Sequence, residues 1–137
     1  MNLHKITTKH LENFAFESTI DTYQFKMDSS DEPTGAGAPS PKKLMLSALA
    51  GCTGIDVVSI LQKMKVDFTD FSISTEASLT EEHPKIYDKV SIVYSIKVSE
   101  TDKPKVERAV QLSKEKYCGV SAMFGHFAKI KWEINFL

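Results

Sequence analysis

Cysteine and arginine are both scarce in this chain of 137 residues. The two cysteines are Cys52 and Cys118, and the single arginine is Arg108, so lysine supplies almost all of the basic charge. Two cysteines are too few for the disulfide framework of a small secreted protein, or for a four-ligand zinc site without histidines. The four histidines are scattered along the chain: His4, His10, His83 and His126. We therefore expect no metal site.

An excess of charge of either sign is also missing. The net charge is −1, from 17 basic and 18 acidic residues. Nucleic-acid binding usually depends on a strongly basic face, so we expect no nucleic-acid partner. No apolar segment of the signal-peptide kind follows Met1, and no run approaches the ~18 consecutive apolar residues of a membrane span. These absences predict a cytoplasmic protein without a membrane partner, where a pair of cysteines is typically free, catalytic or transiently oxidised.

Length and composition predict one domain. Hydrophobic residues make up 42% and charged residues 26% of the chain, which is ordinary for a globular protein. Because a domain takes roughly 100–200 residues, we expect a single domain over residues 1–137.

The hydrophobic pattern predicts strands first and then one long helix. Polar and apolar residues alternate around Phe14–Phe16 and in Tyr23–Met27, as in half-buried strands. Residues 28–39 gather Gly, Pro, Ser and Asp and read as a loop. Ser40 as N-cap and Pro41 at the first position begin a helix that runs to about Met64. Its apolar residues cover nearly all faces, which is typical of a buried central helix.

The second half alternates between strands and helices. Residues 71–79 and 90–98 predict an antiparallel pair of strands, and residues 130–136 predict a final strand. Between them, a helix starting near Thr101 and a short helix after Gly119 are expected. The first of these helices has an apolar inner face formed by Val106, Ala109, Val110 and Tyr117. This order is α+β, and a fully buried helix would need a partner subunit for complete cover.

Cys52 lies inside the long helix, between Gly51 and Gly54. Glycine is costly inside a helix, so the pair suggests a close backbone approach around the thiol. Three polar residues share the helical face of Cys52: Asp56, Ser59 and Lys63. A ligand pocket, a subunit interface or solvent must meet this stripe, and an ionised carboxylate there would oppose thiolate formation. The alternative interpretation of Cys52 is a small buried hydrophobe.

Cys118 lies at the start of the predicted short helix, where the free N–H groups favour a thiolate. Lys116 adds positive charge nearby, whereas Glu115 opposes it. Simple packing is again the alternative, and the sequence alone does not say whether the two cysteines meet. In the first turn of the long helix, Lys42 and Lys43 either pair with the acidic loop or form an anion site.

Two segments together resemble the OsmC/Ohr family, and most closely its YhfA-like branch. The first runs from Ala38-Pro39-Ser40-Pro41 through Gly51-Cys52-Thr53-Gly54-Ile55-Asp56 to Lys63. The second runs from Arg108-Ala109-Val110-Gln111-Leu112-Ser113 to Glu115-Lys116-Tyr117-Cys118. The order of strands and helices agrees with the family over essentially the whole chain.

The resemblance implies an α+β, OsmC-like fold, with the long buried helix wrapped by antiparallel sheets in an intertwined homodimer. It also implies a thiol peroxidase that reduces organic hydroperoxides, with active sites at the dimer interface. Cys52 would be the peroxidatic cysteine that becomes a sulfenic acid, and Cys118 the resolving cysteine. A dithiol reductant, lipoyl-type in some members, would restore both thiols, and no cofactor is expected.

The chain departs from the family in two places. The family's early-strand arginine is absent, because Arg108 lies in the second motif, and Lys42-Lys43 occupy the place of a glutamate near the start of the helix. Asp56 or Glu115 could supply a carboxylate instead, and Lys42 or Lys43 a cation. One alternative function is therefore a non-peroxidatic small-ligand-binding or redox-sensing protein on the OsmC scaffold. A further alternative is that both thiols are buried and inert.

Overall fold

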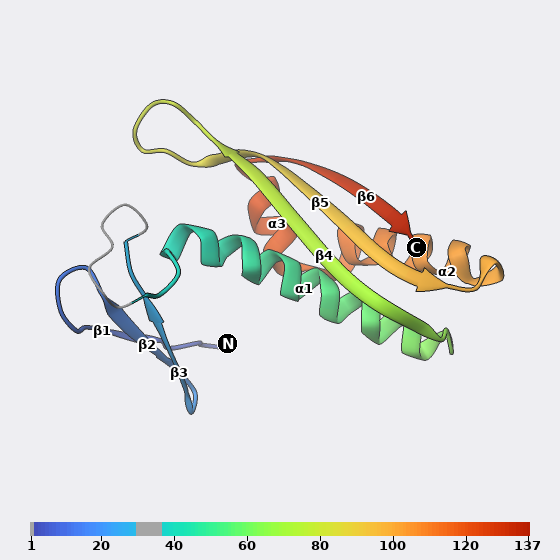
Figure 1. The fold of residues 1–137 in the computed structure, drawn as a ribbon, viewed down its shortest axis with the longest axis horizontal. Helices are drawn as coiled ribbons and strands as arrows, with labels where there is room; N and C mark the ends of the chain where they lie inside the picture. The colour runs from blue at the N-terminus through green and yellow to red at the C-terminus, as the bar shows by residue number, and fades with distance from the viewer. Residues whose placement is uncertain (1, 30–36) are drawn as a thin grey trace. The chain divides into compact units, whose positions relative to one another are not determined.

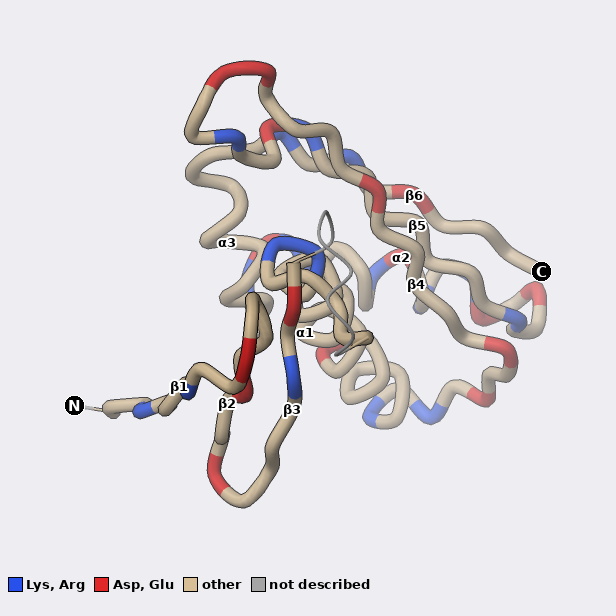
Figure 2. The backbone as a smooth tube through the Cα atoms, turned by 60° about the vertical axis from the view of Figure 1, so that its left-hand side comes forward, with Lys and Arg blue, Asp and Glu red and all other residues tan. Residues whose placement is uncertain are grey.

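The computed structural model describes residues 2–29 and 37–137, so most of the predicted loop at 28–39 lies outside the described residues. The chain forms two units, Met1–Met45 and Leu46–Leu137. The order of strands and helices is α+β, as predicted (Figure 1). Basic and acidic residues are both distributed along the described chain (Figure 2).

The N-terminal unit contains an antiparallel sheet in the order β1-β2-β3. Its strands are β1 (Thr7–His10), β2 (Phe16–Ile20) and β3 (Tyr23–Met27). The predicted alternation at Tyr23–Met27 is confirmed as a strand, and Asp21, with φ 55°, turns the chain between β2 and β3. Strand β1 was not predicted because its four residues are all polar and exposed. Phe14 precedes β2 rather than belonging to a strand.

Helix α1 (Pro41–Lys63) begins at the predicted residue. The Ser40 hydroxyl accepts a hydrogen bond from the Lys43 N–H at 3.4 Å, which is an N-cap contact. One face is fully buried, and its four residues are spaced four apart: Leu49, Thr53, Val57 and Leu61. The prediction of burial on nearly all faces is wrong for the single chain, since Ile55 is 72% exposed. One sheet covers only one face of a helix.

Length and composition alone would allow α1 to cross a membrane, contrary to the sequence-based expectation. Core helices of water-soluble proteins meet the same criterion. In this structure the apolar character of α1 serves packing on one side, through Leu49, Val57 and Leu61.

The C-terminal unit contains a mixed sheet in the order β4-β5-β6. Strands β4 (Phe68–Leu79) and β5 (Tyr87–Val98) pair antiparallel, as predicted. Strand β6 (Lys129–Phe136) pairs parallel to β5, so the expectation of purely antiparallel sheets is wrong here. Parallel pairing requires a crossover connection, and the helical segment between β5 and β6 supplies it.

That crossover contains four short helices. They are η1 (Glu100–Asp102), α2 (Lys103–Leu112), the π-helix η2 (Ser113–Tyr117) and α3 (Gly119–Gly125). Val106, Ala109 and Val110 are buried, as predicted. Tyr117 is 53% exposed, contrary to the prediction, because the wider π-turn shifts it from the inner face of α2.

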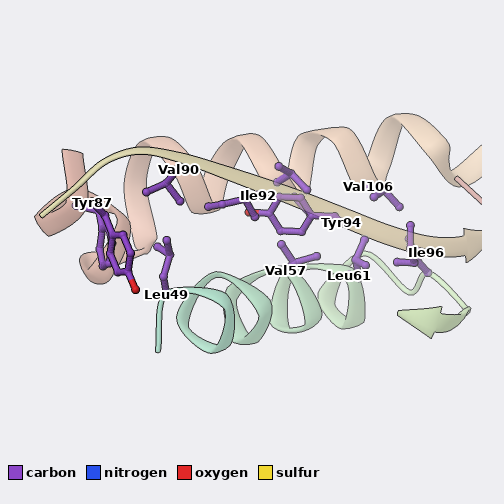
Figure 3. Packing of buried hydrophobic residues seen from close by; sticks show 13 residues of the cluster. Leu49, Val57, Leu61, Tyr87, Val90, Ile92, Tyr94, Ile96 and Val106 are labelled. Carbon is purple, nitrogen blue, oxygen red and sulfur yellow. The ribbon is translucent and has the colours of Figure 1, made fainter. Parts of the chain in front are cut away.

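The core of the C-terminal unit lies between α1, β5 and α2. Figure 3 shows Leu49, Val57 and Leu61 of α1 directed toward β5, whose inward side chains include Tyr94 and Ile96. On β5 every second residue from Val90 to Ile96 is buried, as expected for a strand with one face on the core. The core therefore fixes the rotation of α1 about its axis.

The substitution Leu61→Ala tests this packing. Leu61 is fully buried, so its truncation leaves a cavity, and we expect a loss of about 2–5 kcal/mol in the free energy of unfolding. Urea denaturation followed by circular dichroism measures it. The matched control is Leu79→Ala at the exposed end of β4, expected to cost less than about 1 kcal/mol. Equal losses in both variants would contradict the assignment of Leu61 to the core.

Candidate active site at Cys52 and Cys118

The structure brings together Cys52, Asp56 and Cys118. The two sulfurs and one Asp56 carboxylate oxygen all lie within 4.8 Å of one another. Cys52 and Asp56 are one helical turn apart on the same face of α1, and Cys118 directly precedes α3. The question that the sequence left open, whether the cysteines meet, is thereby answered.

Cys118 is a buried thiol held in place by α3. Its side chain is 3% exposed, and its Sγ accepts a hydrogen bond from the Ser121 N–H at 3.3 Å. The Ser121 hydroxyl in turn donates to the Cys118 carbonyl oxygen at 3.0 Å. Burial raises the pKa of the Cys118 thiol; hydrogen bonds from Ser121 lower it in part, and the neighbouring Cys52 thiol raises it further. Cys118 is therefore a neutral thiol near pH 7.

Cys52 is only partly buried, so it is the more accessible of the two thiols. Of the two glycines beside it, Gly54 marks a close approach, since a Cβ there would lie 3.1 Å from the Ile73 Cδ1. A Cβ at Gly51 would meet open space. The predicted close approach is thus confirmed at Gly54 and wrong at Gly51.

A chain of buried hydroxyl groups ends at Asp56. The Thr53 hydroxyl lies 2.6 Å from the Tyr94 hydroxyl and 2.8 Å from that of Ser113, and Ser113 donates to Asp56 Oδ2 at 3.0 Å. Each hydroxyl has one hydrogen, so the last bond fixes the others: Tyr94 donates to Thr53, and Thr53 to Ser113. The three groups come from α1, β5 and η2, and all their donors point toward the carboxylate.

Tyr94 is a fully buried donor at the far end of this chain. Burial raises the pKa of its hydroxyl above the ordinary value, as does the charge of Asp56 and, once ionised, that of Cys118, while the hydrogen bond to Thr53 lowers the pKa in part. The phenol therefore stays neutral. Its ring stacks on Trp132 with centroids 6.2 Å apart.

Sequence reasoning missed this network. The signal for Thr53 and Ser113 was their place in the two motifs beside Cys52 and Cys118. Tyr94 gave no signal apart from strand alternation, because its functional feature is one hydroxyl group at the end of a core side chain.

The polar stripe on α1 meets a cavity of about 350 Å³ in the C-terminal unit. Asp56, Ser59 and Lys63 line it together with apolar side chains from α1 and the crossover: Ile60, Met64, Leu112 and Tyr117. The sequence left open whether a ligand pocket, a subunit interface or solvent meets this stripe. In the single chain, the stripe lines a pocket. Asp56 belongs both to the cavity wall and to the thiol cluster, so it links the two.

Of the other predicted supporting residues, Glu115 lies outside the cluster of thiols and Asp56. Glu115 is exposed on η2 and accepts a hydrogen bond from the Gln111 Nε2 at 3.1 Å. Arg108 is exposed on α2. The first turn of α1, in the N-terminal unit, contains Lys42 and Lys43. Their supporting roles stay predictions. Their pairing with the acidic loop also stays a prediction, because residues 30–36 of that loop lie outside the described residues.

Two thiols and one carboxylate at this spacing can support two kinds of chemistry. The thiols can be oxidised in turn and joined as a disulfide, with the carboxylate moving protons. The same atoms are also ligand types that a thiophilic metal ion accepts.

Comparisons with known proteins agree with the sequence motifs. Residues 31–133 match the family described as OsmC-like protein. Protein YhfA of Escherichia coli K12 is 38% identical over 101 residues, which cover 74% of this chain and 73% of that protein.

Solved structures share the fold. The crystal structure of a hypothetical protein from Aquifex aeolicus VF5 has a TM-score of 0.82 at 29% identity, covering 100% of this chain and 99% of that one. The organic hydroperoxide resistance protein OhrB of Bacillus subtilis has a TM-score of 0.66 at 17% identity, covering 98% of each chain, and shows the fold alone. By its sequence motifs, its family match and its relatives, the chain belongs to the OsmC-like family.

Proposed function

We propose that this protein is a thiol peroxidase that reduces organic hydroperoxides. The observation that carries the proposal is the meeting of both thiols and the Asp56 carboxylate within 4.8 Å. A structural neighbour, OhrB of Bacillus subtilis, is named for organic hydroperoxide resistance.

Exposure decides which thiol attacks. Cys52 is partly exposed, whereas Cys118 is buried and its raised pKa keeps it neutral. The Cys52 thiolate attacks the outer oxygen of the hydroperoxide, the O–O bond breaks, and the sulfur becomes a sulfenic acid. The inner oxygen leaves as an alkoxide and takes a proton to become the alcohol. Asp56 accepts the Cys52 proton and returns it to this oxygen, as a general base and then acid.

Resolution uses the second thiol. The Cys118 sulfur attacks the Cys52 sulfenic acid, an S–S bond forms, and the hydroxyl leaves as water with the Cys118 proton. A disulfide has sulfurs about 2.05 Å apart, so the two side chains, whose sulfurs lie within 4.8 Å, must move together to complete the bond. A dithiol reductant, for which we propose a lipoyl-type compound, returns two electrons and two protons by thiol–disulfide exchange. The net reaction turns hydroperoxide and dithiol into alcohol, water and disulfide.

The cavity beside Asp56 suits the organic part of the substrate. Its apolar wall is formed by Ile60, Met64 and Leu112, and its polar side by Asp56, Ser59 and Lys63. A hydroperoxide with an apolar body would place its O–O group at the polar side, near the sulfurs. Ligand pockets of this kind are largely apolar, with few polar groups that fix orientation.

A redox sensor on the same scaffold is the second candidate function. It is favoured by the position of the single arginine, because Arg108 is exposed on α2 and a lysine is a poor substitute for a planar guanidinium fork. A sensor would be oxidised once per chain, whereas a peroxidase turns over.

We propose further that the single domain over residues 1–137 works in the cytoplasm as a homodimer. Ile55 is 72% exposed on α1, and beside it a shallow groove of about 610 Å³ runs between α1 and β4. Small and apolar residues line this groove, among them Ala50, Gly51, Val58 and Phe71. A second copy of the chain would cover the exposed side of α1.

Thiol labelling tests the order of the two cysteines. The raised pKa of Cys118 means that its thiolate appears only as the pH rises above the ordinary thiol range. At pH 8, iodoacetamide should label Cys52 before Cys118 in the reduced protein, as read by peptide mass spectrometry. In Cys52→Ser, labelling of Cys118 should be much slower in the folded protein than in urea. Equal rates in both conditions would contradict the buried, neutral thiol.

Turnover tests the peroxidase proposal. With cumene hydroperoxide and dihydrolipoamide, we expect multiple turnovers in the wild type and only background consumption in Cys52→Ser. Cys118→Ser should stop at a sulfenic acid that dimedone traps. Asp56→Asn should lower kcat by roughly 10²–10⁴-fold, the usual contribution of general acid–base catalysis. The control Glu133→Gln, at an exposed position on β6, should match the wild type.

Two results would reject the peroxidase. Wild-type oxidation that stops at one equivalent would favour the redox sensor. Equal background rates in the wild type and Cys52→Ser would leave both thiols without a role in peroxide chemistry.

Sedimentation velocity tests the dimer. We expect the wild type to have twice the chain mass of 15.3 kDa in solution. The variant Ile55→Glu should shift toward the monomer, because an unpaired charge buried in the interface opposes association. The matched control is Leu137→Glu, because Leu137 is an exposed apolar residue outside α1. A wild-type monomer at micromolar concentration would reject the proposed dimer.

A further inference from the structure

The cluster of Cys52, Asp56 and Cys118 has the composition of a metal site as well as that of a redox site. Two sulfurs and one carboxylate oxygen are ligands that Zn²⁺ accepts, at about 2.3 Å for sulfur and 2.0–2.2 Å for oxygen. In a tetrahedral site such ligand atoms lie roughly 3.5–3.8 Å apart, as these bond lengths require. The present separations, all within 4.8 Å, reach this spacing through small side-chain rotations.

We propose that the reduced cluster of Cys52, Asp56 and Cys118 binds one zinc ion, and that oxidation of the two cysteines to a disulfide releases it. Zinc binding itself is independent of the proposed peroxidase function, whereas the release step rests on the disulfide chemistry proposed there.

Neighbouring groups already hold two of the three ligands. The Ser113 hydroxyl donates to Asp56 Oδ2 at 3.0 Å, backed by Thr53. The Ser121 N–H donates to Cys118 Sγ at 3.3 Å. Such outer hydrogen bonds orient metal ligands and stabilise their anionic forms.

The site leaves one coordination position for water. Asp56 lines the cavity of about 350 Å³, and Cys52 is partly exposed, so solvent reaches the cluster from that side. Two sulfur ligands select against Mg²⁺ and Ca²⁺, which prefer oxygen. With three protein ligands and a water, the site would be four-coordinate, as zinc prefers.

Zinc and peroxide would compete for the same sulfurs. While both thiolates are bound to the ion, their reaction with a peroxide is slowed. When oxidation does occur, the two thiolate sulfurs lose two electrons and form the S–S bond. The hydroperoxide takes these electrons and two protons from solvent and becomes alcohol and water. Zn²⁺ leaves unchanged, because only Asp56 remains to hold it.

Cobalt titration tests the site without any peroxide. Co²⁺ is added to the full-length protein, reduced with a phosphine, and the near-ultraviolet thiolate-to-cobalt band is followed. We expect saturation at one equivalent per chain and loss of the band on adding one equivalent of Zn²⁺. Protein oxidised with diamide should give no band. In a second measurement, one equivalent of Zn²⁺ should slow alkylation of Cys52 in the wild type.

Variants assign the ligands. Cys52→Ser and Cys118→Ser should each weaken the thiolate band and the affinity, and Asp56→Asn should weaken the affinity while keeping the band. Ser113→Ala should cost about 10–100-fold in affinity, as expected for an outer hydrogen bond. Glu133→Gln is the control that should bind like the wild type, and circular dichroism checks that each variant is folded.

Some outcomes would overturn the proposal. One is that the wild type shows no thiolate-to-cobalt band at one equivalent of Co²⁺. The other is that cobalt binding is unchanged in Cys52→Ser and Cys118→Ser. Failure to bind zinc together with Cys52-dependent turnover would reject the zinc site alone. Zinc binding without turnover would reject the peroxidase alone.

Discussion

The hydrogen bond from Ser113 to Asp56 is the contact on which the site depends. It joins the crossover segment to α1. It also fixes the direction of donation in the series of hydrogen bonds that runs from Tyr94 through Thr53 and Ser113 to the carboxylate. All three hydroxyls are buried, so each needs a partner, and each finds one within the chain. Breaking one bond would leave a buried polar group unsatisfied, at a cost of about 1–3 kcal/mol. The core and the reactive cluster are thus held by the same groups.

Much of the fold follows from the sequence alone. The extent of α1, the antiparallel pair β4–β5 and strand β6 were predictable because each shows a regular apolar period. Strand β1 was not, because its polar residues pair through backbone hydrogen bonds that carry no hydrophobic signal. The parallel pairing of β6 was also beyond reach, since the alternation of a strand says which face is buried and nothing about the direction of its neighbour.

The site was predictable in its parts more than in its assembly. Motif resemblance singled out Cys52 and Cys118, and helical spacing singled out Asp56, but only the tertiary structure of the C-terminal unit brings them together. Glu115 was a reasonable carboxylate by sequence proximity, yet it faces solvent. Proximity along a chain is a poor guide wherever the local helix is not α-helical, because side-chain directions then follow a different period.

The π-helix at Ser113–Tyr117 has a further consequence for how this segment can vary. The Cys118 N–H donates to the Ser113 carbonyl oxygen at 2.9 Å, so a single wide turn separates Ser113 from the thiol. One residue fewer would convert the turn to an α-turn and rotate Cys118 by about 100° relative to Ser113, given 3.6 residues per turn. The segment therefore tolerates changes of residue type better than changes of length. The number of residues in this turn sets the distance between Ser113, which orients the Asp56 carboxylate, and Cys118, which supplies the second sulfur.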